Sequence, residues 1–300
     1  MKLKFLSLTA IIAIMFAACC NKPKTYNSVD EYPEYKGADL GVTYSPEKSF
    51  FRVWSPAAQE VRLNIYEDGL EGVPTQVFDM KYDVDGTWIY TVKEDIVGKF
   101  YTFQIKQNDQ WLEPTPGIWA KAVGVNGMRG AIIDWATTNP EGWENDVRPE
   151  MKSFTDAVIY EVHMRDYTIH PSSGSSFPGK FLGLSEAGTK TIDGLTAGID
   201  HLKELGITHV QILPSYDYGS IDETRLADNK YNWGYDPKNY NVPEGGYATD
   251  PYSPATRILE LKTMIQQLHA AGWYRLLLEG FLQRPDHSGR YYRVCSAGYA

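Results

Sequence analysis

The hydrophobic pattern changes near Pro149, and this change constrains the fold of the 300-residue chain more than any other feature. Residues 49–134 consist of short runs in which apolar and polar residues alternate, separated by turn residues and without a helical period. That pattern predicts an antiparallel β-sandwich over residues 41–148, in the size range of immunoglobulin-like domains. Beyond Pro149, apolar strands alternate with amphipathic helices, which is typical of βα units on a parallel sheet.

The second part contains two apolar runs and two sets of apolar residues at helical spacing. Residues 156–164 (DAVIYEVHM) predict a first strand, and residues 207–214 (ITHVQILP) predict a second, buried strand. The helical sets are Leu195, Ile199 and Leu202, which end at Gly206, and Ile258, Leu261, Ile265 and Leu268, which end at Gly272.

Residues 1–20 have the composition of an export signal. Two lysines precede an apolar run at residues 5–18, which is too short to span a bilayer comfortably. Two alanines stand directly before Cys19, as in the cleavage site of bacterial lipoproteins. We therefore expect an exported lipoprotein, anchored to a membrane through Cys19, in the periplasm or at the cell surface. A plain secretory signal is the alternative, and residues 21–40 predict a polar linker.

The composition excludes some partners and bonds. Lys and Arg number 29 against 38 Asp and Glu, and the net charge of -9 would repel a nucleic acid. Cys295 is the only cysteine beyond residue 20, so the two predicted domains cannot form a disulfide from their own cysteines. Aromatic residues make up 13% of the chain, and such rings suit either sugar ligands or a hydrophobic core.

Residues 231–237 (YNWGYDP) place three aromatic rings around an amide, a carboxylate and a glycine. They follow the second predicted strand, and parallel sheets carry their ligand sites at this end. Trp233 or Tyr235 offers a flat face to a pyranose, and Asn232 and Asp236 offer acceptors to its hydroxyl groups. The same polar groups would equally pin a long loop, and composition alone leaves both interpretations open.

Several stretches resemble the bacterial type I pullulanases, which are α-1,6-glucan debranching enzymes of the α-amylase superfamily. The stretches are YNWGYDP, FRVWSPAAQEVRLNIYEDG (residues 51–69), DAVIYEVHMRDYT (156–168), GIDHLKELGITHVQILPSYDYGSIDE (198–223) and YNVPEGGYATDP (240–251). They follow the family's order over about residues 40–272. The resemblance implies that residues 41–148 are a starch-binding-like accessory domain and that residues 149–300 begin a catalytic (β/α)8 TIM barrel.

The resemblance also implies a ligand for the heptad. Tyr235 would stack on the sugar at the point of cleavage, and the remaining side chains would shape that subsite. These are Tyr231, Asn232, Trp233 and Asp236. The implied partners are α-glucans such as pullulan, starch and glycogen.

The implied reaction is retaining cleavage by carboxyl groups at the ends of the fourth, fifth and seventh barrel strands. Residues 149–300 are too few for a barrel of about 250 residues, so we expect no catalytic residue in this chain. We therefore expect a pullulanase-type enzyme by family, present as a non-catalytic fragment. The alternative is a non-catalytic surface lipoprotein that binds α-glucan through the sandwich. The candidate rings are Trp54, Trp88, Trp111 and Trp119.

Residues after Gly272 depart from the family sequence. A shifted reading frame and an internal deletion both explain the departure, and the sequence leaves the choice open. Residues 273–281 (WYRLLLEGF) are apolar enough to form a third strand.

Two groups of titratable residues predict structure rather than chemistry. The end of the first strand predicts an ion-pair network of Glu161, His163, Arg165 and Asp166. The acidic loop with Asp217, Asp222, Glu223 and Asp228 lacks the spacing of a twelve-residue calcium loop. Calcium is possible at such a loop, but nothing in its spacing supports it, so we expect a solvated loop with no metal and no cofactor.

Overall fold

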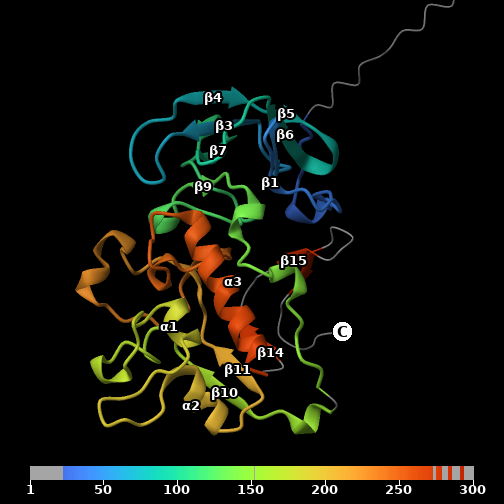
Figure 1. Ribbon diagram of the computed structural model, residues 1–300. Helices are drawn as coiled ribbons and strands as arrows, with labels where there is room; N and C mark the ends of the chain where they lie inside the picture. Colours follow the sequence, from blue (N-terminus) through green and yellow to red (C-terminus); the bar gives the residue numbers. More distant parts are fainter. Residues whose placement is uncertain (1–22, 152, 273–274, 279–282, 286–290, 294–300) are drawn as a thin grey trace, which may run out of the picture.

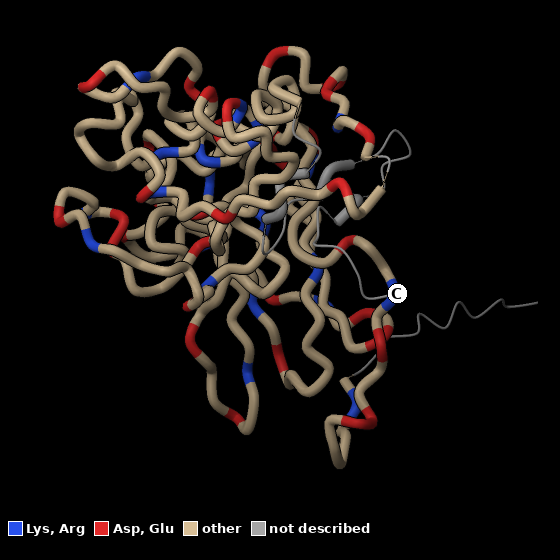
Figure 2. Tube along the Cα trace, turned by 90° about the horizontal axis from the view of Figure 1, so that it is seen from below, with Lys and Arg blue, Asp and Glu red and all other residues tan. Residues whose placement is uncertain are grey.

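The computed structural model describes residues 23–151, 153–272, 275–278, 283–285 and 291–293. These residues form two parts, a β-rich part stacked on a part that contains the α-helices (Figure 1). The predicted signal at residues 1–20, its lipidation site Cys19 and the later Cys295 lie outside the described residues. No described helix has the length and apolar character that a membrane-spanning helix needs. Figure 2 shows Lys and Arg interspersed with Asp and Glu along the described trace.

The first part is the predicted antiparallel β-sandwich. One sheet has the strand order β1-β2-β6-β5, formed by Gly41–Ser45, Lys48–Trp54, Thr87–Val92 and Lys81–Tyr82. The other has the order β4-β3-β7-β8, formed by Gln76–Asp79, Glu60–Tyr66, Phe100–Gln107 and Gln110–Trp111. A short strand, β9 (Gly130–Ala131), also pairs with β7.

Side chains of alternating residues build the core between the two sheets. In β3, Val61 and Leu63 are 1% and 0% exposed. Phe51 of the opposite sheet meets Tyr101 and Phe103 of β7 edge-on, with ring centroids 5.3 and 6.5 Å apart. Burying each such side chain contributes about 1.5–3 kcal/mol, so this pattern stabilises the sandwich over any alternative register.

Part of the predicted linker packs on the sandwich. A short 3-10 helix, η1 (Val29–Glu31), is followed by Pro33, whose carbonyl oxygen accepts from Trp54 Nε1 at 3.1 Å. Arg52 forms ion pairs with Asp39 at 2.9 Å and with Asp83 at 2.6 Å. The polar segment is therefore attached to the first sheet through Pro33 and Asp39.

The second part contains a parallel sheet and α-helices. Strands β10 (Ile159–Val162), β11 (His209–Ile212) and β14 (Arg275–Leu278) lie in the order β10-β11-β14. The helices are α1 (Phe181–Ser185), α2 (Gly198–Glu204) and α3 (Pro254–Ala270). The predicted order of strands and helices is confirmed, as is a third strand within residues 273–281. Strands β15 (Gln283–Pro285) and β16 (Tyr291–Arg293) form a separate antiparallel pair.

Helix α3 follows its prediction because its signals are local. The Ser253 hydroxyl caps the helix by accepting from Thr256 N at 3.2 Å, and Pro254 occupies the first turn. Beyond its last residue stands Gly272, with a positive φ of 95° that suits glycine. The predicted apolar residues are all buried, and they are Ile258, Leu261, Ile265 and Leu268.

Helix α2 is shorter than predicted. It begins at Gly198, so Leu195 lies outside it and is 66% exposed, whereas Ile199 and Leu202 are buried. A local turn holds Leu195 instead, because its N–H donates to Thr191 Oγ1 at 3.1 Å and its carbonyl accepts from Thr191 N at 2.8 Å. Helical spacing was therefore wrong for Leu195.

A second core lies between the parallel sheet and the helices. Leu202, Ile212 and Leu261 come from α2, β11 and α3, and each is at most 2% exposed. In contrast, Ile159 of β10 is 53% exposed, and β10 pairs with β11 alone among the described strands. The upper end of α3 also meets the sandwich, where Ile258 joins a small apolar cluster of that part (Figure 1).

Candidate functional site

The heptad at residues 231–237 lies in a long loop that follows the carboxyl end of β11. Strand β12 (Tyr216–Tyr218) and strand β13 (Pro237–Pro243) pair in antiparallel fashion, and residues 219–236 connect them. We call residues 219–236 the aromatic loop. It contains a 3-10 helix, η8 (Glu223–Asp228), followed by the first six residues of the heptad, whose last residue, Pro237, begins β13.

The three rings of the heptad lie at the surface. Tyr231 is 42% exposed, Trp233 is 62% exposed and Tyr235 is 58% exposed. The Tyr231 ring meets the Trp233 ring edge-on at 5.3 Å, and the His163 ring lies 4.9 Å from Tyr231. Exposed rings of this kind offer apolar faces that suit the C–H side of a sugar.

The amide and carboxylate of the heptad hold the loop. Asn232 Nδ2 donates to Asp236 Oδ1 and to Ser220 Oγ, both at 2.8 Å, and Asn232 Oδ1 accepts from Gly234 N at 2.8 Å. Asp236 Oδ2 accepts from Ser220 N at 2.8 Å and also from the Ser220 hydroxyl. Although burial acts to raise the pKa of Asp236, these hydrogen bonds outweigh it and lower the pKa. Thus the polar pair pins the loop while the rings remain at the surface.

Gly234 is required by a close approach of two backbones. Its φ is +89°, and a Cβ at this position would lie 2.2 Å from the carbonyl oxygen of Pro214. Any larger residue would strain the backbone and push the loop away from the segment after β11. The glycine therefore seats the heptad against the end of the parallel sheet.

Three residues of the predicted ion-pair network lie beneath the heptad. His163 Nε2 is 2.7 Å from the carbonyl oxygen of Asn232, and its ring Nδ1 accepts from Asp166 N at 3.2 Å. Arg165 pairs with Asp166 and donates to Asn229 Oδ1 at 2.5 Å. The fourth predicted member, Glu161, instead accepts from Gln211 on β11 at 3.0 Å. The network therefore contacts the aromatic loop through His163 and Arg165.

The acidic loop was predicted to be solvated, and this is wrong for two of its four carboxylates. Asp217 is 1% and Glu223 3% exposed, and they lie beside Glu244 and Arg257, which are both 0% exposed. Arg257 Nη2 is 3.1 Å from Glu223 Oε2, and Nη1 is 3.5 Å from Asp217 Oδ1. Asp222 does lie at the surface. The buried guanidinium offsets part of the cost of burying the carboxylates.

Burial raises the pKa of two carboxyl groups in this cluster, Asp217 and Glu244. The pKa of Asp217 rises to about 6, because burial and then the neighbouring Glu223 outweigh Arg257. Burial likewise raises the pKa of Glu244 well above its usual range, with Glu223 and Asp217 adding to the effect. Both carboxyl groups therefore hold their protons to a higher pH than an exposed carboxyl group does.

Asp217, Glu223 and Glu244 are also the described carboxylates closest to a metal-ligand arrangement. One oxygen from each lies within 4.8 Å of the others. However, Arg257 already binds two of the three, and its positive charge opposes a cation there. Sequence reasoning missed Arg257, yet it stands four residues before Leu261 within the apolar face of α3, and that placement signals a buried, paired arginine.

A cavity of about 120 Å³ lies beside the network and under η8. Arg165, Lys180, Tyr218 and Asp228 are among its lining residues. Lys180 Nζ donates to the carbonyl oxygen of Gly246 at 2.8 Å, and burial lowers the pKa of Lys180. The volume is below that of the 150 Å³ engineered cavities that admit benzene, so it suits a few waters rather than a sugar ring.

The tryptophans of the sandwich differ in exposure. Trp54 is 36% and Trp119 43% exposed. Trp88 is a poor candidate for sugar binding, because it is 5% exposed and its Nε1 donates to the carbonyl oxygen of Ser55 at 3.0 Å. Trp111 is half-buried, with the Arg62 guanidinium 4.1 Å from its ring. Of the four predicted tryptophans, Trp54 and Trp119 are therefore the two whose rings are exposed to solvent.

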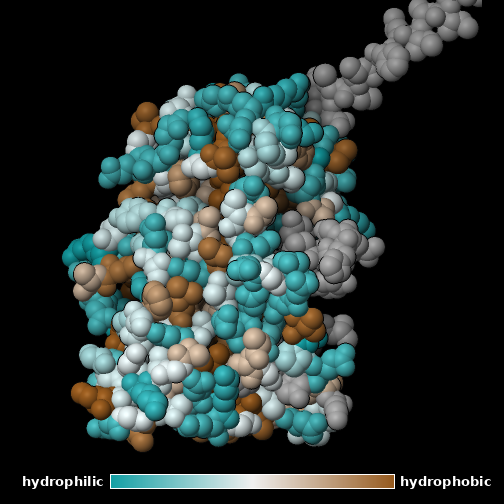
Figure 3. Space-filling view, viewed as in Figure 1, coloured by the Kyte–Doolittle hydropathy of each residue, from teal (hydrophilic) through white to brown (hydrophobic). Residues whose placement is uncertain are grey.

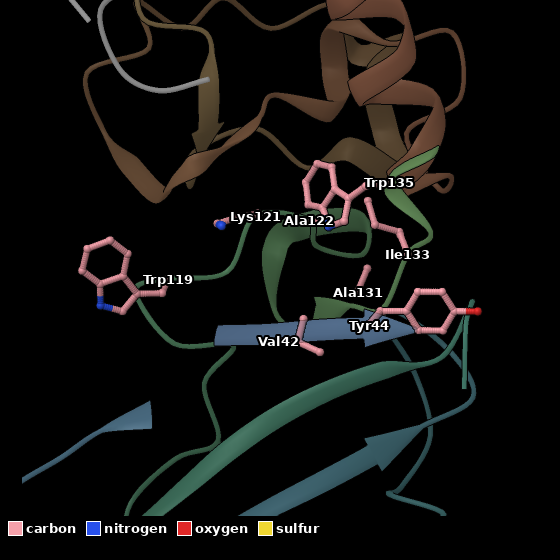
Figure 4. Close-up of a pocket in the computed structure, with 8 residues that line it drawn as sticks. All are labelled: Val42, Tyr44, Trp119, Lys121, Ala122, Ala131, Ile133 and Trp135. Carbon is pink, nitrogen blue, oxygen red and sulfur yellow. The ribbon is translucent and has the colours of Figure 1, made fainter. Parts of the chain in front are cut away.

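A hollow near Trp119 is too small for a sugar. Val42, Tyr44, Trp119 and Trp135 are among its lining residues, and its volume of about 10 Å³ holds roughly one water molecule. Figure 4 shows the Trp119 ring turned away from Trp135. On the face shown in Figure 3, apolar side chains lie in small scattered groups among polar ones. Any glucan at the sandwich would lie on the surface.

Comparison with known protein families gives one match within the sandwich. Residues 39–120 match carbohydrate-binding module 48, which is described as the isoamylase N-terminal domain. Among relatives, the chain is 39% identical over 250 residues to the pullulanase of Bacillus subtilis, covering 83% of this chain and 33% of that protein. It is 28% identical over 289 residues to the chloroplastic pullulanase 1 of Arabidopsis thaliana, covering 81% of this chain and 28% of that protein.

Solved structures give the same picture. The pullulanase of Paenibacillus barengoltzii in complex with maltohexaose and α-cyclodextrin is 55% identical, with a TM-score of 0.81 over 83% of this chain and 38% of that chain. The pullulanase of Bacillus acidopullulyticus is 42% identical, with a TM-score of 0.78 over 83% of this chain and 30% of that chain. The chain thus spans about a third of the length of these relatives.

Proposed function

Because the chain is homologous to the type I pullulanases over four-fifths of its length, we propose that it forms the glucan-binding part of an α-1,6-glucan debranching enzyme. In this proposal the parallel strands begin a (β/α)8 barrel, and the exposed rings of the heptad receive the sugar chain. The observation that carries the proposal is the position of Tyr231, Trp233 and Tyr235, all at the surface beyond a parallel strand. The related pullulanase that binds maltohexaose supports the choice of ligand.

We propose that this chain binds α-glucan without cleaving it. Retaining cleavage needs two carboxyl groups about 5 Å apart and free to reach the sugar. The carboxylates described beside the rings are occupied, since Asp236 is bonded to Asn232 and Ser220, and Asp166 is paired with Arg165. Incubation with pullulan should therefore release no reducing ends, and release of maltotriose would contradict this part of the proposal.

Maltohexaose binding, measured by calorimetry on the full chain, tests the role of the rings. Trp233→Ala and Tyr235→Ala should each weaken binding by about tenfold, since each removes a stacking face. Tyr252→Ala is a matched control, because Tyr252 is 56% exposed but lies outside the aromatic loop. Equal affinity of the wild type and both ring variants would reject the heptad as the glucan site. No cofactor is proposed, so EDTA should leave the affinity unchanged.

Binding through the sandwich is the second candidate function. It is favoured by the carbohydrate-binding-module match at residues 39–120 and by the exposure of Trp54 and Trp119. Retardation in a native gel containing amylopectin separates the two candidates. If Trp119→Ala or Trp54→Ala removes the retardation while Trp233→Ala keeps it, the sandwich is the binding site.

Export as a lipoprotein is proposed from the sequence of the first 20 residues alone. When cells that produce the protein are fed radiolabelled palmitate, the protein should become labelled. The Cys19→Ser variant should carry no label. Labelling that survives this substitution would exclude Cys19 as the anchor.

A further inference from the structure

We infer that the sandwich positions the aromatic loop through residues 124–129, so that Asn126 is a positioning residue for the glucan site. This inference rests on the proposed function of the heptad, and it adds a role for the sandwich that needs no sugar on the sandwich itself. We call residues 124–129 the tongue. The tongue precedes β9, which Figure 1 shows at the end of the sandwich that faces α3.

The tongue is fixed at its base. Arg129 donates to the carbonyl oxygens of Asp68 and Glu71, both at 2.6 Å, and to that of Gly72 at 2.7 Å. Its guanidinium also lies 3.8 Å from the Tyr66 ring. The tongue is therefore held rigidly by the sandwich from which it projects.

Asn126 binds the start of η8 through three hydrogen bonds. Its backbone N–H donates to Glu223 Oε2 at 2.7 Å, and its side-chain oxygen accepts from Glu223 N at 2.7 Å. Its Nδ2 donates to Asp222 Oδ1 at 2.9 Å. Asn126 has a φ of +61°, which asparagine tolerates better than most residues and which aims the backbone and side chain together at Glu223.

The tongue also reaches both strands that bound the aromatic loop. The carbonyl oxygen of Gly127 accepts from Asn239 Nδ2 at 2.9 Å, and the same Nδ2 donates to Asp217 Oδ2 at 2.6 Å. Gly127 is packed so closely that a Cβ there would lie 2.3 Å from Asp217 Oδ2. Lys238 Nζ donates to the carbonyl oxygen of Asn126 at 2.5 Å. The tongue thus ties together the end of β12, the start of η8 and the start of β13.

Helix α3 completes the support from the other side. Arg257 is buried and pairs with the same Glu223 that the tongue holds, and Gly245 N donates to Glu223 Oε1 at 2.9 Å. The start of the aromatic loop is therefore held between the sandwich and α3. Ordering such a long loop costs conformational entropy, and these bonds offset that cost before any sugar arrives. A ligand binds more tightly when the competent loop conformation is already populated.

The test compares Asn126→Gly with Asn108→Gly in the full chain. Glycine tolerates a positive φ, so Asn126→Gly removes two side-chain hydrogen bonds without straining the backbone. Asn108 is a matched control, because it is also an asparagine of the sandwich with a positive φ of 51°, and it lies in the exposed turn between β7 and β8. Lys238→Met, which removes a second contact with the tongue, guards against a folding defect specific to residue 126.

Two measurements are made on each variant: hydrogen exchange of residues 219–236 and the affinity for maltohexaose. If Asn126→Gly lowers the competent fraction of the loop to about a tenth, exchange there should rise and the apparent Kd should increase by about tenfold. Lys238→Met should change both in the same direction by less, and Asn108→Gly should change neither.

The inference is overturned if Asn126→Gly leaves loop exchange at the wild-type rate. It is also overturned if exchange rises while affinity stays the same, or if Asn108→Gly has an equal effect. Absence of maltohexaose binding by the wild type would instead reject the proposed function. In that case the exchange data alone decide whether the tongue orders the loop.

Discussion

Replacing Arg257 by methionine should destabilise the second part by about 3–5 kcal/mol, because removal of one partner leaves buried charges uncompensated. The arginine is 0% exposed, and its guanidinium lies 3.1 Å from Glu223 Oε2 and 3.5 Å from Asp217 Oδ1. It also donates to the carbonyl oxygens of Pro243 at 3.3 Å and Pro251 at 2.7 Å. Methionine fills similar space but replaces none of these interactions.

The loss of stability in the Arg257→Met variant should depend on pH. Burial already raises the pKa of Asp217 to about 6 and raises the pKa of Glu244, while Arg257 acts in the opposite direction on both. Without Arg257 both carboxyl groups should take up protons at higher pH, and a neutral acid costs less to bury than a carboxylate. The destabilisation should therefore be larger at about pH 7.5 than at about pH 5.5.

Urea unfolding at both pH values measures the effect. With a slope of about 1–3 kcal/mol per molar urea, the midpoint for the second part should fall by roughly 2 M at the higher pH. Arg225→Met is the control, since Arg225 is 65% exposed and pairs with Asp228 at 3.0 Å at the surface. That pair should contribute about 1 kcal/mol at most. An Arg257→Met midpoint equal to that of the wild type, or a loss of stability independent of pH, would refute this account of the cluster.

Three further predictions concern single positions. Gly234→Ala should lower the melting temperature far more than Gly188→Ala, because both have positive φ but only residue 234 would clash, with the Pro214 carbonyl oxygen at 2.2 Å. In the wild type, the raised pKa of Asp217 stabilises the folded state at low pH, and this contribution is lost as the pH rises through about 6. Asp217→Asn should therefore remove a fall in the free energy of unfolding of about 1 kcal/mol between about pH 5 and 7. An unchanged dependence of urea unfolding on pH would contradict this prediction. Tyr101→Phe should raise the free energy of unfolding by about 1 kcal/mol, because the buried hydroxyl has no hydrogen-bond partner among the described residues; a loss of stability in urea would show that the hydroxyl is bonded.

The parts of the fold that were predictable are those specified by neighbouring residues. The alternation in β3 and the apolar stripe of α3 each identify their buried face within a single element. Leu195 was misplaced because a turn with Thr191 competes with the helix, and spacing carries no information on such a turn. The exposure of the β10 side chains was equally unpredictable from the sequence, since their burial depends on which elements lie next to the strand.

The candidate site was predictable as a location but not as an arrangement. The sequence of the heptad identifies the three aromatic residues, and their exposure follows from their place in a loop after a strand. The burial of Glu223, however, depends on Arg257, which is 34 residues away, and on Asn126, which is 97 residues away. A run of acids near turn residues reads as solvated loop until those distant partners are known.

The two interpretations that the heptad allowed describe different atoms of the same motif. Both amide hydrogens of Asn232 are already donated, one to Asp236 and one to Ser220. Asp236 accepts from Asn232 and twice from Ser220, which leaves about one of its four acceptor sites. A sugar on this loop would therefore find ring faces, but Asn232 and Asp236 would offer it few hydrogen-bonding sites. Since stacking alone discriminates little between pyranoses, any choice of glucan should come from polar groups other than those of Asn232 and Asp236.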